Sequence, residues 1–465
     1  MKVTLINPLQ STGYPQPPLG LALIAAVLER EGFIVELIDA NALKLRPGQV
    51  AALLLDTDII GLTAMTPTIT GAAEIARQVK KIKRGSTIIL GGTHGTLMPA
   101  ETLSAIPEID IVVRGEGELT AVELLRGLRS KHPLAEIQGI SYRSEGQIYH
   151  TDSRDLIDDL DSLPFLAYHM LPLHKYKPHP PHGRAYPFAT IITSRGCPYR
   201  CSYCSKPIFG SIFRAQSPER VIDEISYYMS KFGVREIAFY DDVLTLDKKR
   251  IHAISDGILK IGRKLNWTCE SRVNLVDREI LRHMKAAGCY AIAYGIESAS
   301  QEILDAIHKG IKPEQVIEAI RMTREAGMQT IGYFMIGSPG ETRDTINATI
   351  EFAKSLKLDF VQFSITTPLP GSELYKIYRE SGRADVPWES YVYESTSDIE
   401  TPVFESANLK RADLRYFRAQ AYKRFYLRFS YVWQRIRRMT SFGDLMINIK
   451  GLIMLLQDIT PGRLR

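Results

Sequence analysis

The sequence predicts an α/β protein in which a doubly wound, five-stranded parallel sheet is followed by a partial six-stranded β/α barrel and a helical C-terminal region. Short apolar segments alternate with helical segments over most of the 465 residues, a pattern typical of parallel sheets covered by helices. A segment rich in proline, histidine and tyrosine divides this alternation in two. A chain of this length can also form two or three domains, each with its own core.

The chain is expected to divide into four regions. Residues 1–150 form the first sheet, 151–187 a linker, 188–375 the barrel, and 376–465 a helical, basic region. In the first region, strands are predicted at residues 3–6, 34–38, 59–62, 87–90 and 109–113. Helices are predicted at residues 19–31, 50–55, 71–83 and from 118 onward, with a small hairpin at 138–150. No G-x-G-x-x-G motif follows the first strand, which argues against a dinucleotide site.

The barrel region repeats a strand followed by a helix six times. Its strands are predicted at residues 188–193, 236–240, 266–270, 290–294, 329–335 and 360–364. Its helices are predicted at residues 218–232, from 248, and at 277–287, 301–309, 313–326 and 345–356. Parallel strands direct their carboxyl ends to one edge, so the functional site is expected in the loops that follow the strands.

Three cysteines lie close together directly after the first barrel strand. Cys197, Cys201 and Cys204 have a C-x3-C-x2-C spacing, too close for unstrained disulfides with one another but suited to one soft metal centre. A cubane iron–sulfur cluster usually has four cysteine ligands, so three would leave one iron open to another ligand. The alternative is a zinc site completed by Cys269 or Cys289, although zinc sites more often pair two C-x2-C units. Otherwise these last two cysteines are interpreted as buried structural thiols.

The cysteine spacing, together with Tyr203 just before the last cysteine, resembles the radical S-adenosylmethionine (SAM) superfamily. The resemblance implies a [4Fe-4S] cluster whose open iron binds the amino and carboxylate groups of SAM, with Tyr203 beside the adenine. The ends of the next strands carry polar residues that the resemblance assigns to SAM. These are Tyr240, Asp241 and Asp242 for the amino group, Glu270 and Arg272 for the carboxylate, and Glu297 and Ser298 for the ribose and methionine region. Each could instead be a capping or turn residue, because Asp, Ser and Gly favour such positions.

Small and hydroxyl-bearing residues follow the strands of the first region, where backbone can approach a large flat ligand closely. Placed before a radical SAM core, these loops resemble the cobalamin-binding domain of cobalamin-dependent radical SAM enzymes. The resemblance implies a cobalamin site formed by Pro18, Leu19, Gly20, Thr63, Met65, Thr66, Gly91, Gly92, His94, Arg114, Gly115 and Glu116. The alternative is a flavodoxin-like domain that binds nothing.

No D-x-H-x-x-G motif is present in the first region. The resemblance therefore implies base-off cobalamin with no histidine on its lower face. His94 is the one candidate substitute, and it is more simply interpreted as a hydrogen-bonding loop residue.

Charge is unevenly distributed along the chain. The formal net charge is +6, but residues 410–465 contain thirteen Lys/Arg and three Asp, hence +10, which leaves −4 for the rest. The amphipathic helix predicted in this region, with apolar residues from Leu414 to Ile436, could lie on an anionic membrane surface or pack over the barrel mouth with a solvated basic face. No nucleic-acid-reading motif accompanies the charge, so no nucleic-acid partner is expected.

The remaining composition indicates a reducing compartment. Only five cysteines occur, three of them in one motif, which argues against a disulfide framework. The N-terminus does not have the form of a signal peptide, and no stretch of eighteen apolar residues appears. We therefore predict a cytoplasmic protein, with membrane association as a second possibility.

The resemblance implies an enzyme that methylates an unactivated carbon through a 5′-deoxyadenosyl radical and methylcobalamin. The alternative is an oxidative cyclase or ring-rearranging enzyme acting on a tetrapyrrole or lipid without net methyl transfer. A third hypothesis is a cofactor-binding sensor without catalysis. For the first two, a small-molecule or lipid substrate and a reductant such as flavodoxin or ferredoxin are implied, and no catalytic residue is identified.

Overall fold

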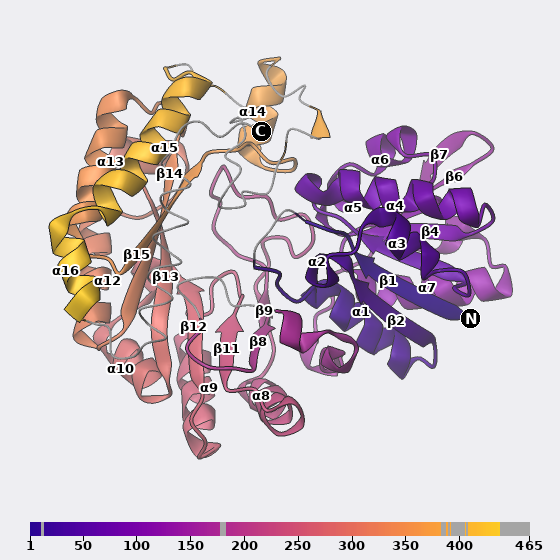
Figure 1. Ribbon diagram of the computed structural model, residues 1–465, viewed down its shortest axis with the longest axis horizontal. Helices are drawn as coiled ribbons and strands as arrows, with labels where there is room; N and C mark the ends of the chain where they lie inside the picture. Colours follow the sequence, from indigo (N-terminus) through magenta and orange to yellow (C-terminus); the bar gives the residue numbers. More distant parts are fainter. Residues whose placement is uncertain are drawn as a thin grey trace.

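In the computed structural model the chain forms two lobes that face one another (Figure 1). The structure describes residues 1–10, 14–176, 183–382, 387–388, 391, 405 and 408–437. The first lobe contains a seven-stranded sheet, and the second contains a six-stranded sheet that curves around its own interior. The two predicted α/β units are thereby confirmed.

The first sheet has the strand order β2-β1-β3-β4-β5-β6-β7. Its first five strands are parallel, as predicted, and are β1 (Lys2–Asn7), β2 (Ile34–Asp39), β3 (Ile59–Thr63), β4 (Thr87–Gly91) and β5 (Ile111–Val113). The predicted hairpin is present, but it extends the sheet: β6 (Ile140–Ser144) pairs antiparallel with β5 and with β7 (Gln147–His150). Its buried residues Ile140 and Tyr142 belong to the core of this lobe.

Helices cover both faces of the first sheet, as a doubly wound fold requires. On one face α1 (Leu19–Arg30) and α7 (Gly117–Ser130) pack into one apolar core. On the other face a second core contains α3 (Pro47–Ala52), α4 (Ile69–Ile82) and α6 (Pro99–Ala105). The short segments of this lobe are α2 (Ala40–Leu43), η1 (Thr66–Thr68), α5 (Thr93–Leu97) and η2 (Leu134–Glu136).

The segment between the sheets has three short 3-10 turns and is not a free connector. They are η3 (Leu160–Ser162), η4 (Tyr168–Met170) and η5 (Leu173–Lys175). The buried Tyr168 hydroxyl donates to the carbonyl oxygen of Thr190 at 2.5 Å in the second lobe. The buried Tyr176 hydroxyl donates to Asp39 Oδ2 at 2.8 Å in the first lobe. The segment therefore ties the two lobes together.

The second sheet has six parallel strands in the order β15-β14-β13-β12-β11-β8. They are β8 (Phe188–Ile191), β11 (Glu236–Phe239), β12 (Asn266–Ser271), β13 (Cys289–Glu297), β14 (Gln329–Ile336) and β15 (Phe360–Ile365). The surrounding helices are α8 (Pro218–Phe232), α9 (Lys248–Lys260), α10 (Arg278–Ala286), α11 (Gln301–Ala306), α12 (Pro313–Glu325) and α13 (Arg343–Ser355), with η6 (Val273–Leu275). This is the predicted partial barrel, and the carboxyl ends of its strands share one edge.

The described C-terminal helices are α14 (Glu373–Glu380), α15 (Arg411–Tyr426) and α16 (Phe429–Arg437). Helix α15 lies along the edge strand β15: the backbone N–H of Val361 donates to the Tyr426 hydroxyl at 2.9 Å, and Arg418 Nε donates to the carbonyl oxygen of Phe363 at 3.1 Å. An edge strand covered in this way is closed to pairing with another chain. A helix therefore packs on the barrel, but along its edge strand and not over its mouth as predicted. The predicted basic tail beyond residue 437 lies outside the described residues. In the part of the chain that is described, no helix combines the length and the apolar character needed to cross a bilayer.

Candidate functional site

The three cysteines lie on one loop that a short antiparallel ribbon closes. Strand β9 (Ser194–Arg195) pairs with β10 (Arg214–Ala215), and residues 196–213 form the loop between them. Gly196 has φ +81°, and a Cβ atom there would lie 2.1 Å from the carbonyl oxygen of Ile212, so only glycine fits this close turn. The backbone N–H of Cys204 donates to the carbonyl oxygen of Cys201 at 3.1 Å, which makes a tight turn between two of the thiols.

Two cations hold the cysteine loop. Lys206 Nζ donates to the carbonyl oxygens of Cys197, at 2.5 Å, and of Tyr199. Arg272 stacks on the Tyr199 ring with its guanidinium carbon 3.6 Å from the centroid, and its Nη1 lies 3.7 Å from Cys201 Sγ. These cations can offset the negative charge of thiolates and of an anionic cluster.

The chemistry of this loop fits an iron–sulfur cluster. All three thiols are free; Cys197 and Cys201 are half-buried and Cys204 is exposed. Metal binding would deprotonate these thiols. Within the described residues no three His, Cys, Asp or Glu side chains are already gathered as metal ligands.

Cys269 and Cys289, the candidate fourth ligands of the zinc alternative, lie elsewhere. Both are buried in the apolar core of the second lobe, on β12 and β13. The Cys289 thiol donates to the carbonyl oxygen of Ala291 at 3.6 Å, and the neighbouring Cys289 together with burial raises the pKa of Cys269. Their environment agrees with the predicted structural role.

Tyr203, Glu297 and a lysine join the cysteine loop to the end of β13. The Tyr203 hydroxyl donates to Glu297 Oε1 at 2.9 Å, and Lys309 Nζ donates to the same oxygen at 2.7 Å. A Cβ atom on Gly295 would lie 2.6 Å from Lys309 Nζ, so a larger residue there would displace the lysine head. Burial raises the pKa of Tyr203, and the negative charge of Glu297 adds to this effect.

Lys309 was missed by sequence reasoning. It is buried and neutralises Glu297, which otherwise would be an unpaired buried charge. A lysine between Ile307 and Ile311 in an apolar segment is the one sequence signal that could have pointed to it, because lysine is rarely buried unless paired.

Asp241 differs from its predicted role in SAM binding. It is buried and accepts hydrogen bonds from the backbone N–H of Thr193 at 2.8 Å, from the Thr193 hydroxyl at 2.7 Å and from the Ser194 hydroxyl at 2.5 Å. Burial raises its pKa, while the charge of Arg250 and these hydrogen bonds act against that rise. Asp241 therefore fixes the chain just before the cysteine loop and has its acceptors engaged there.

The other predicted SAM residues line the edge of the barrel in different ways. The Tyr240 hydroxyl donates to Gln16 Oε1 of the first lobe at 3.2 Å, and Asp242 is exposed. Glu270 accepts from the Tyr333 hydroxyl at 3.2 Å, and burial raises its pKa.

Arg272 and Ser298 already have contacts within the protein. Besides its contacts with Tyr199 and Cys201, Arg272 donates to the carbonyl oxygen of Lys309. Ser298 Oγ lies 3.2 Å from Thr349 Oγ1 and accepts from the backbone N–H of Ser300 at 3.2 Å. The Ser298 hydroxyl therefore stabilises the turn that follows β13.

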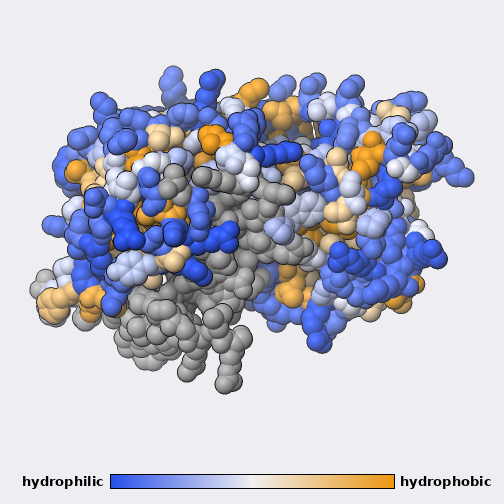
Figure 2. All heavy atoms as spheres, turned by 90° about the horizontal axis from the view of Figure 1, so that it is seen from above, coloured by the Kyte–Doolittle hydropathy of each residue, from blue (hydrophilic) through white to orange (hydrophobic). Residues whose placement is uncertain are grey.

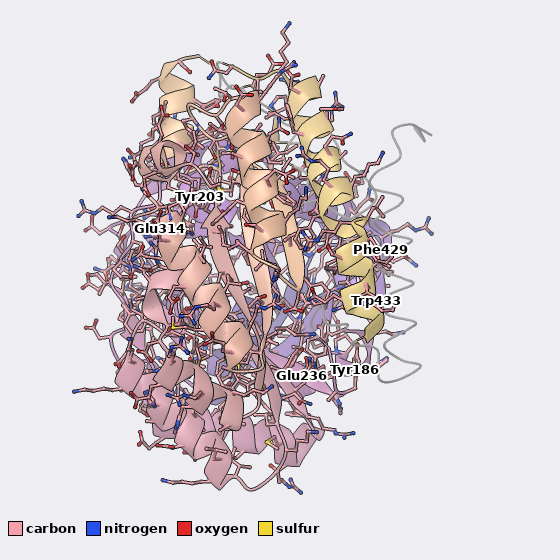
Figure 3. The ribbon with its side chains drawn as sticks, turned by 90° about the vertical axis from the view of Figure 1, so that its left-hand side faces the viewer. Tyr186, Tyr203, Glu236, Glu314, Phe429 and Trp433 are labelled. Atoms are coloured by element: carbon pink, nitrogen blue, oxygen red, sulfur yellow. The ribbon has the colours of Figure 1, made fainter. Side chains whose placement is uncertain are left out.

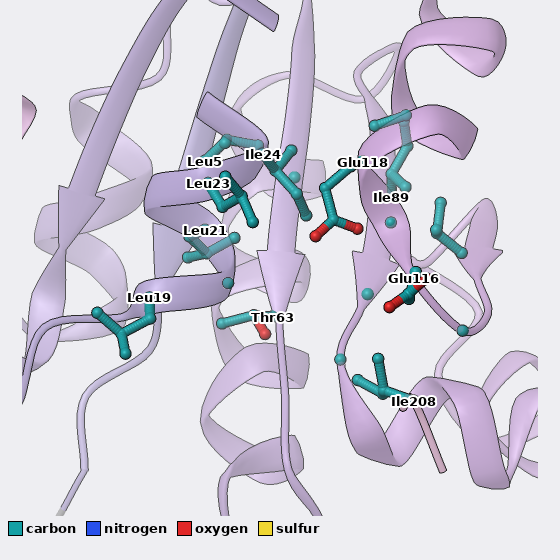
Figure 4. A pocket seen from close by; sticks show the side chains of 18 of the residues that line it. Leu5, Leu19, Leu21, Leu23, Ile24, Thr63, Ile89, Glu116, Glu118 and Ile208 are labelled. Carbon is teal, nitrogen blue, oxygen red and sulfur yellow. The ribbon is translucent and has the colours of Figure 1, made fainter. Parts of the chain in front are cut away.

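A cavity of about 290 Å³ opens between the first sheet and helices α1 and α7 (Figure 4). Its walls are mostly apolar side chains from β1, α1 and α7. Eight of the twelve predicted cobalamin residues line it: Leu19, Gly20, Thr63, Met65, Gly91, Gly92, Gly115 and Glu116. Gly92 has φ +96°, and a Cβ atom there would lie 2.6 Å from the carbonyl oxygen of Ala64. An apolar cavity of this size with small residues on its rim fits an apolar part of a larger ligand that extends beyond it.

Four predicted cobalamin residues, Pro18, Thr66, His94 and Arg114, are not among those that line the cavity. His94 is fully buried; its Nδ1 lies 3.2 Å from Thr66 Oγ1, and its ring packs edge-on against Trp388 with centroids 4.5 Å apart. Burial lowers the pKa of His94 to about 4. Arg114 donates to the carbonyl oxygens of Ile140, at 3.0 Å, and of Thr151. These side chains hold the surrounding loops.

Residues of the second lobe complete the cavity, which the sequence did not predict. Ile192, Arg195, Ile208 and Phe209 are among its lining residues, and the last two follow Cys204 on the cysteine loop. The cysteine loop thus forms part of the cavity wall.

A buried ion cluster joins the two lobes at this wall. Glu116 Oε1 accepts from Arg195 Nη1 at 2.7 Å and from Arg214 Nη2 at 2.9 Å, and Glu118 Oε1 accepts from Arg195 Nη2 at 2.6 Å. Burial opposes ionisation of Glu116, but hydrogen bonds from Arg214, from the backbone N–H of Ile157 and from Arg195 outweigh it, so the pKa of Glu116 is lowered.

Two family models match the chain, each on one lobe. The radical SAM superfamily model matches residues 191–353, and the B12-binding domain model matches residues 8–125. The first match contains all three cysteines, and the second contains the eight predicted residues that line the cavity.

Similar proteins share both lobes. An uncharacterized methyltransferase of Pyrococcus horikoshii is 38% identical over 92% of this chain and 93% of its own length. The anaerobic magnesium-protoporphyrin IX monomethyl ester cyclase of Cereibacter sphaeroides is 28% identical over 97% of this chain and 75% of its own length. Among solved structures, the cobalamin-dependent SAM radical enzyme OxsB with aqua-cobalamin bound has a TM-score of 0.76 at 19% identity, covering 98% of this chain and 72% of OxsB. The likeness to OxsB shows the shared fold.

Removing the thiols should abolish the cluster. We expect the Cys197→Ala, Cys201→Ala, Cys204→Ala triple variant, reconstituted with iron and sulfide without air, to stay colourless and to contain almost no iron. Cys289→Ala is the matched control and should retain the brown, reducible cluster, because its thiol lies in the core. Iron analysis and absorption spectra provide the measurement, and zinc in place of iron in the wild-type protein would contradict the assignment.

The buried His94 should make stability depend on pH in a defined direction. Its pKa is about 4 in the folded state against the usual 6.5, so the unfolded state binds the proton more readily. The contribution of His94 to the free energy of unfolding should therefore be fully present above pH 6.5. It should decrease by up to ~3 kcal/mol as the pH falls from 6.5 towards 4. We expect His94→Asn to show a smaller decrease in urea unfolding between these pH values, whereas His132→Asn, which changes an exposed histidine, should follow the wild type. An equal decrease in the His94→Asn variant would contradict this account.

Proposed function

The chain belongs to the cobalamin-dependent radical SAM family, and on that premise we propose that it is a methyltransferase acting on an unactivated carbon atom. Its cofactors are a [4Fe-4S] cluster, SAM and cobalamin. The observation that carries the proposal is the shared wall: Ile208 and Phe209, which follow the last cysteine, line the cavity of the B12-binding lobe. A substrate between the lobes would have both cofactors within reach.

The relatives support the same proposal. The Pyrococcus horikoshii protein, which matches nearly the whole chain, carries the name methyltransferase. The cyclase of Cereibacter sphaeroides also matches nearly the whole chain at lower identity, and it supports a second candidate, cyclisation or ring rearrangement of a tetrapyrrole or lipid without net methyl transfer.

We assign the chain's own residues to binding and orientation. Bound at these sites, the cluster and SAM supply the radical that removes a hydrogen atom from the substrate, and cobalamin supplies the methyl group. Cys197, Cys201 and Cys204 would ligate iron. Tyr203, held by Glu297 and Lys309, would hold the adenosyl part of SAM. The apolar cavity walls would keep water from the cobalamin.

The products of SAM separate the two candidate functions. We expect the reconstituted, reduced protein with cobalamin and its substrate to form both 5′-deoxyadenosine and S-adenosylhomocysteine, and to transfer a labelled methyl group from SAM to the substrate. Both nucleoside products are measured by chromatography. Deoxyadenosine without S-adenosylhomocysteine or labelled product would contradict methyl transfer and support the cyclase-like reaction. The assay includes a one-electron reductant, for which flavodoxin or ferredoxin is our proposal.

We also propose that helix α16 contacts an anionic membrane surface, where a lipid substrate could be reached. Phe429 and Trp433 are 81% and 48% exposed and stack with centroids 6.4 Å apart; Figure 3 places both on the outer side of α16. Residues 408–437 contain nine Lys/Arg and one Asp. The visible surface is otherwise largely hydrophilic, with apolar side chains in small groups (Figure 2). Exposed aromatic rings beside cations are typical of interfacial contacts.

Vesicle binding tests this contact. We expect the protein to sediment with vesicles of phosphatidylcholine and phosphatidylserine but weakly with phosphatidylcholine alone. Phe429→Ser with Trp433→Ser should weaken binding at least ~10-fold, because burying one aromatic side chain contributes about 1.5–3 kcal/mol. Leu259→Ser removes an exposed apolar side chain from α9 and should have no effect. Equal sedimentation of the double variant and the wild type would contradict the proposal.

A further inference from the structure

The ribbon that closes the cysteine loop carries two buried arginines directly opposite one another. Arg214 is the cross-strand partner of Arg195 in the β9–β10 pair, and both residues are only 6–7% exposed. Like charges directly opposite in a strand pair are destabilising, and burial increases the cost of an unpaired charge. The ribbon therefore depends on carboxylates from elsewhere in the chain.

Those carboxylates come from the other lobe. Glu116 bonds to both arginines and Glu118 bonds to Arg195, all at 2.6–3.0 Å. Glu116 and Glu118 lie at the start of α7, directly after the loop that contributes Gly115 to the cavity. The first lobe thus supplies the carboxylates that neutralise the two arginines at the base of the cysteine loop.

The same residues line the cobalamin cavity. Glu116, Glu118 and Arg195 are all lining residues, and so is Phe209, over whose ring the Arg195 guanidinium carbon lies at 5.0 Å. A ligand in the cavity therefore meets both the ion cluster and the cysteine loop. Any rearrangement of the loop on cluster binding changes the cavity wall, and filling the cavity restricts the loop.

We propose that Arg195 is a positioning residue that couples the two cofactor sites, so that cluster binding raises the affinity for cobalamin and cobalamin binding stabilises the cluster. Both ligands favour one arrangement of residues 194–215, the one in which Arg195 bridges Glu116 and Glu118. Coupling of this kind is reciprocal: each ligand changes the affinity for the other by the same factor, and factors of about 5–150 are typical. The proposal rests on the two cofactors and not on methyl transfer, so a protein that binds both and methylates nothing would leave it intact.

Cobalamin titration measures the coupling. Hydroxocobalamin is added without air to the full chain with and without the reconstituted cluster, and the visible spectrum gives Kd. We expect Kd to be ~10-fold lower with the cluster, a factor within the usual range of site coupling. Reciprocally, cobalamin should slow the loss of iron to a chelator.

Three variants locate the coupling in the ion cluster. Glu118→Gln leaves the Glu116 pairs with Arg195 and Arg214 in place and should bring the ratio of the two Kd values close to one. Its direct effect on cobalamin binding cancels in that ratio. Glu123→Gln, on the same helix in a more exposed pair with Arg154, should keep the wild-type ratio. Arg195→Lys retains the charge without a guanidinium that can bridge two carboxylates, and should also lower the ratio.

Two results would overturn the proposal. One is a wild-type Kd that does not change when the cluster is present. The other is a ratio in Glu118→Gln and Arg195→Lys equal to that of Glu123→Gln. If Glu118→Gln fails to fold, Arg195→Lys decides between the outcomes by itself.

Discussion

Four buried charges at the junction of the lobes set the geometry of the cysteine loop and of the cavity beside it. Arg195 and Arg214 flank the cysteine loop, and Glu116 and Glu118 begin α7. Removing a charged group from water costs several kcal/mol of free energy per ion before pairing offsets it. This ion cluster of four residues therefore contributes little net stability to the fold. Its effect is on specificity. A displaced lobe would leave a buried charge unpaired, and one relative position of the lobes is therefore strongly favoured.

Close backbone contacts act on the same junction. Gly371, after β15, has φ +83°, and a Cβ atom there would lie 2.3 Å from Leu97 Cδ2 of the first lobe and 2.9 Å from Ser205 Oγ of the cysteine loop. Ser205 in turn donates to the carbonyl oxygen of Pro370 at 2.7 Å. Three segments distant in sequence thus meet with no room for a side chain. The ion cluster holds the two ends of the cysteine loop, and this contact holds its middle.

Periodicity and motif spacing were sufficient to predict the fold and the cysteine loop, because alternation of apolar segments and a fixed cysteine spacing are local signals. The roles of individual polar residues were harder to predict. Asp241 follows a strand, as a ligand-binding residue of this fold would. Its carboxylate nevertheless accepts hydrogen bonds from Thr193, which lies just after strand β8. His94 follows two glycines, yet its ring is fully buried. A sequence shows where a polar group occurs but not which way it points, and the carboxylate partners of Arg195 lie 79 and 77 residues away in the chain.

The two proposed cofactor sites, the cysteine loop and the cavity, differ in how completely the folded chain forms them without a ligand. The cavity is shaped by apolar side chains of β1, α1 and α7, whose burial stabilises the lobe in any case. Three thiolates brought together would repel one another, so folding alone cannot favour their assembly. What the chain can fix is the backbone that carries them, through Gly196 and the contacts of Lys206. Because the cavity needs the cysteine loop for part of its wall, the better-prepared site is itself incomplete until that loop is in place.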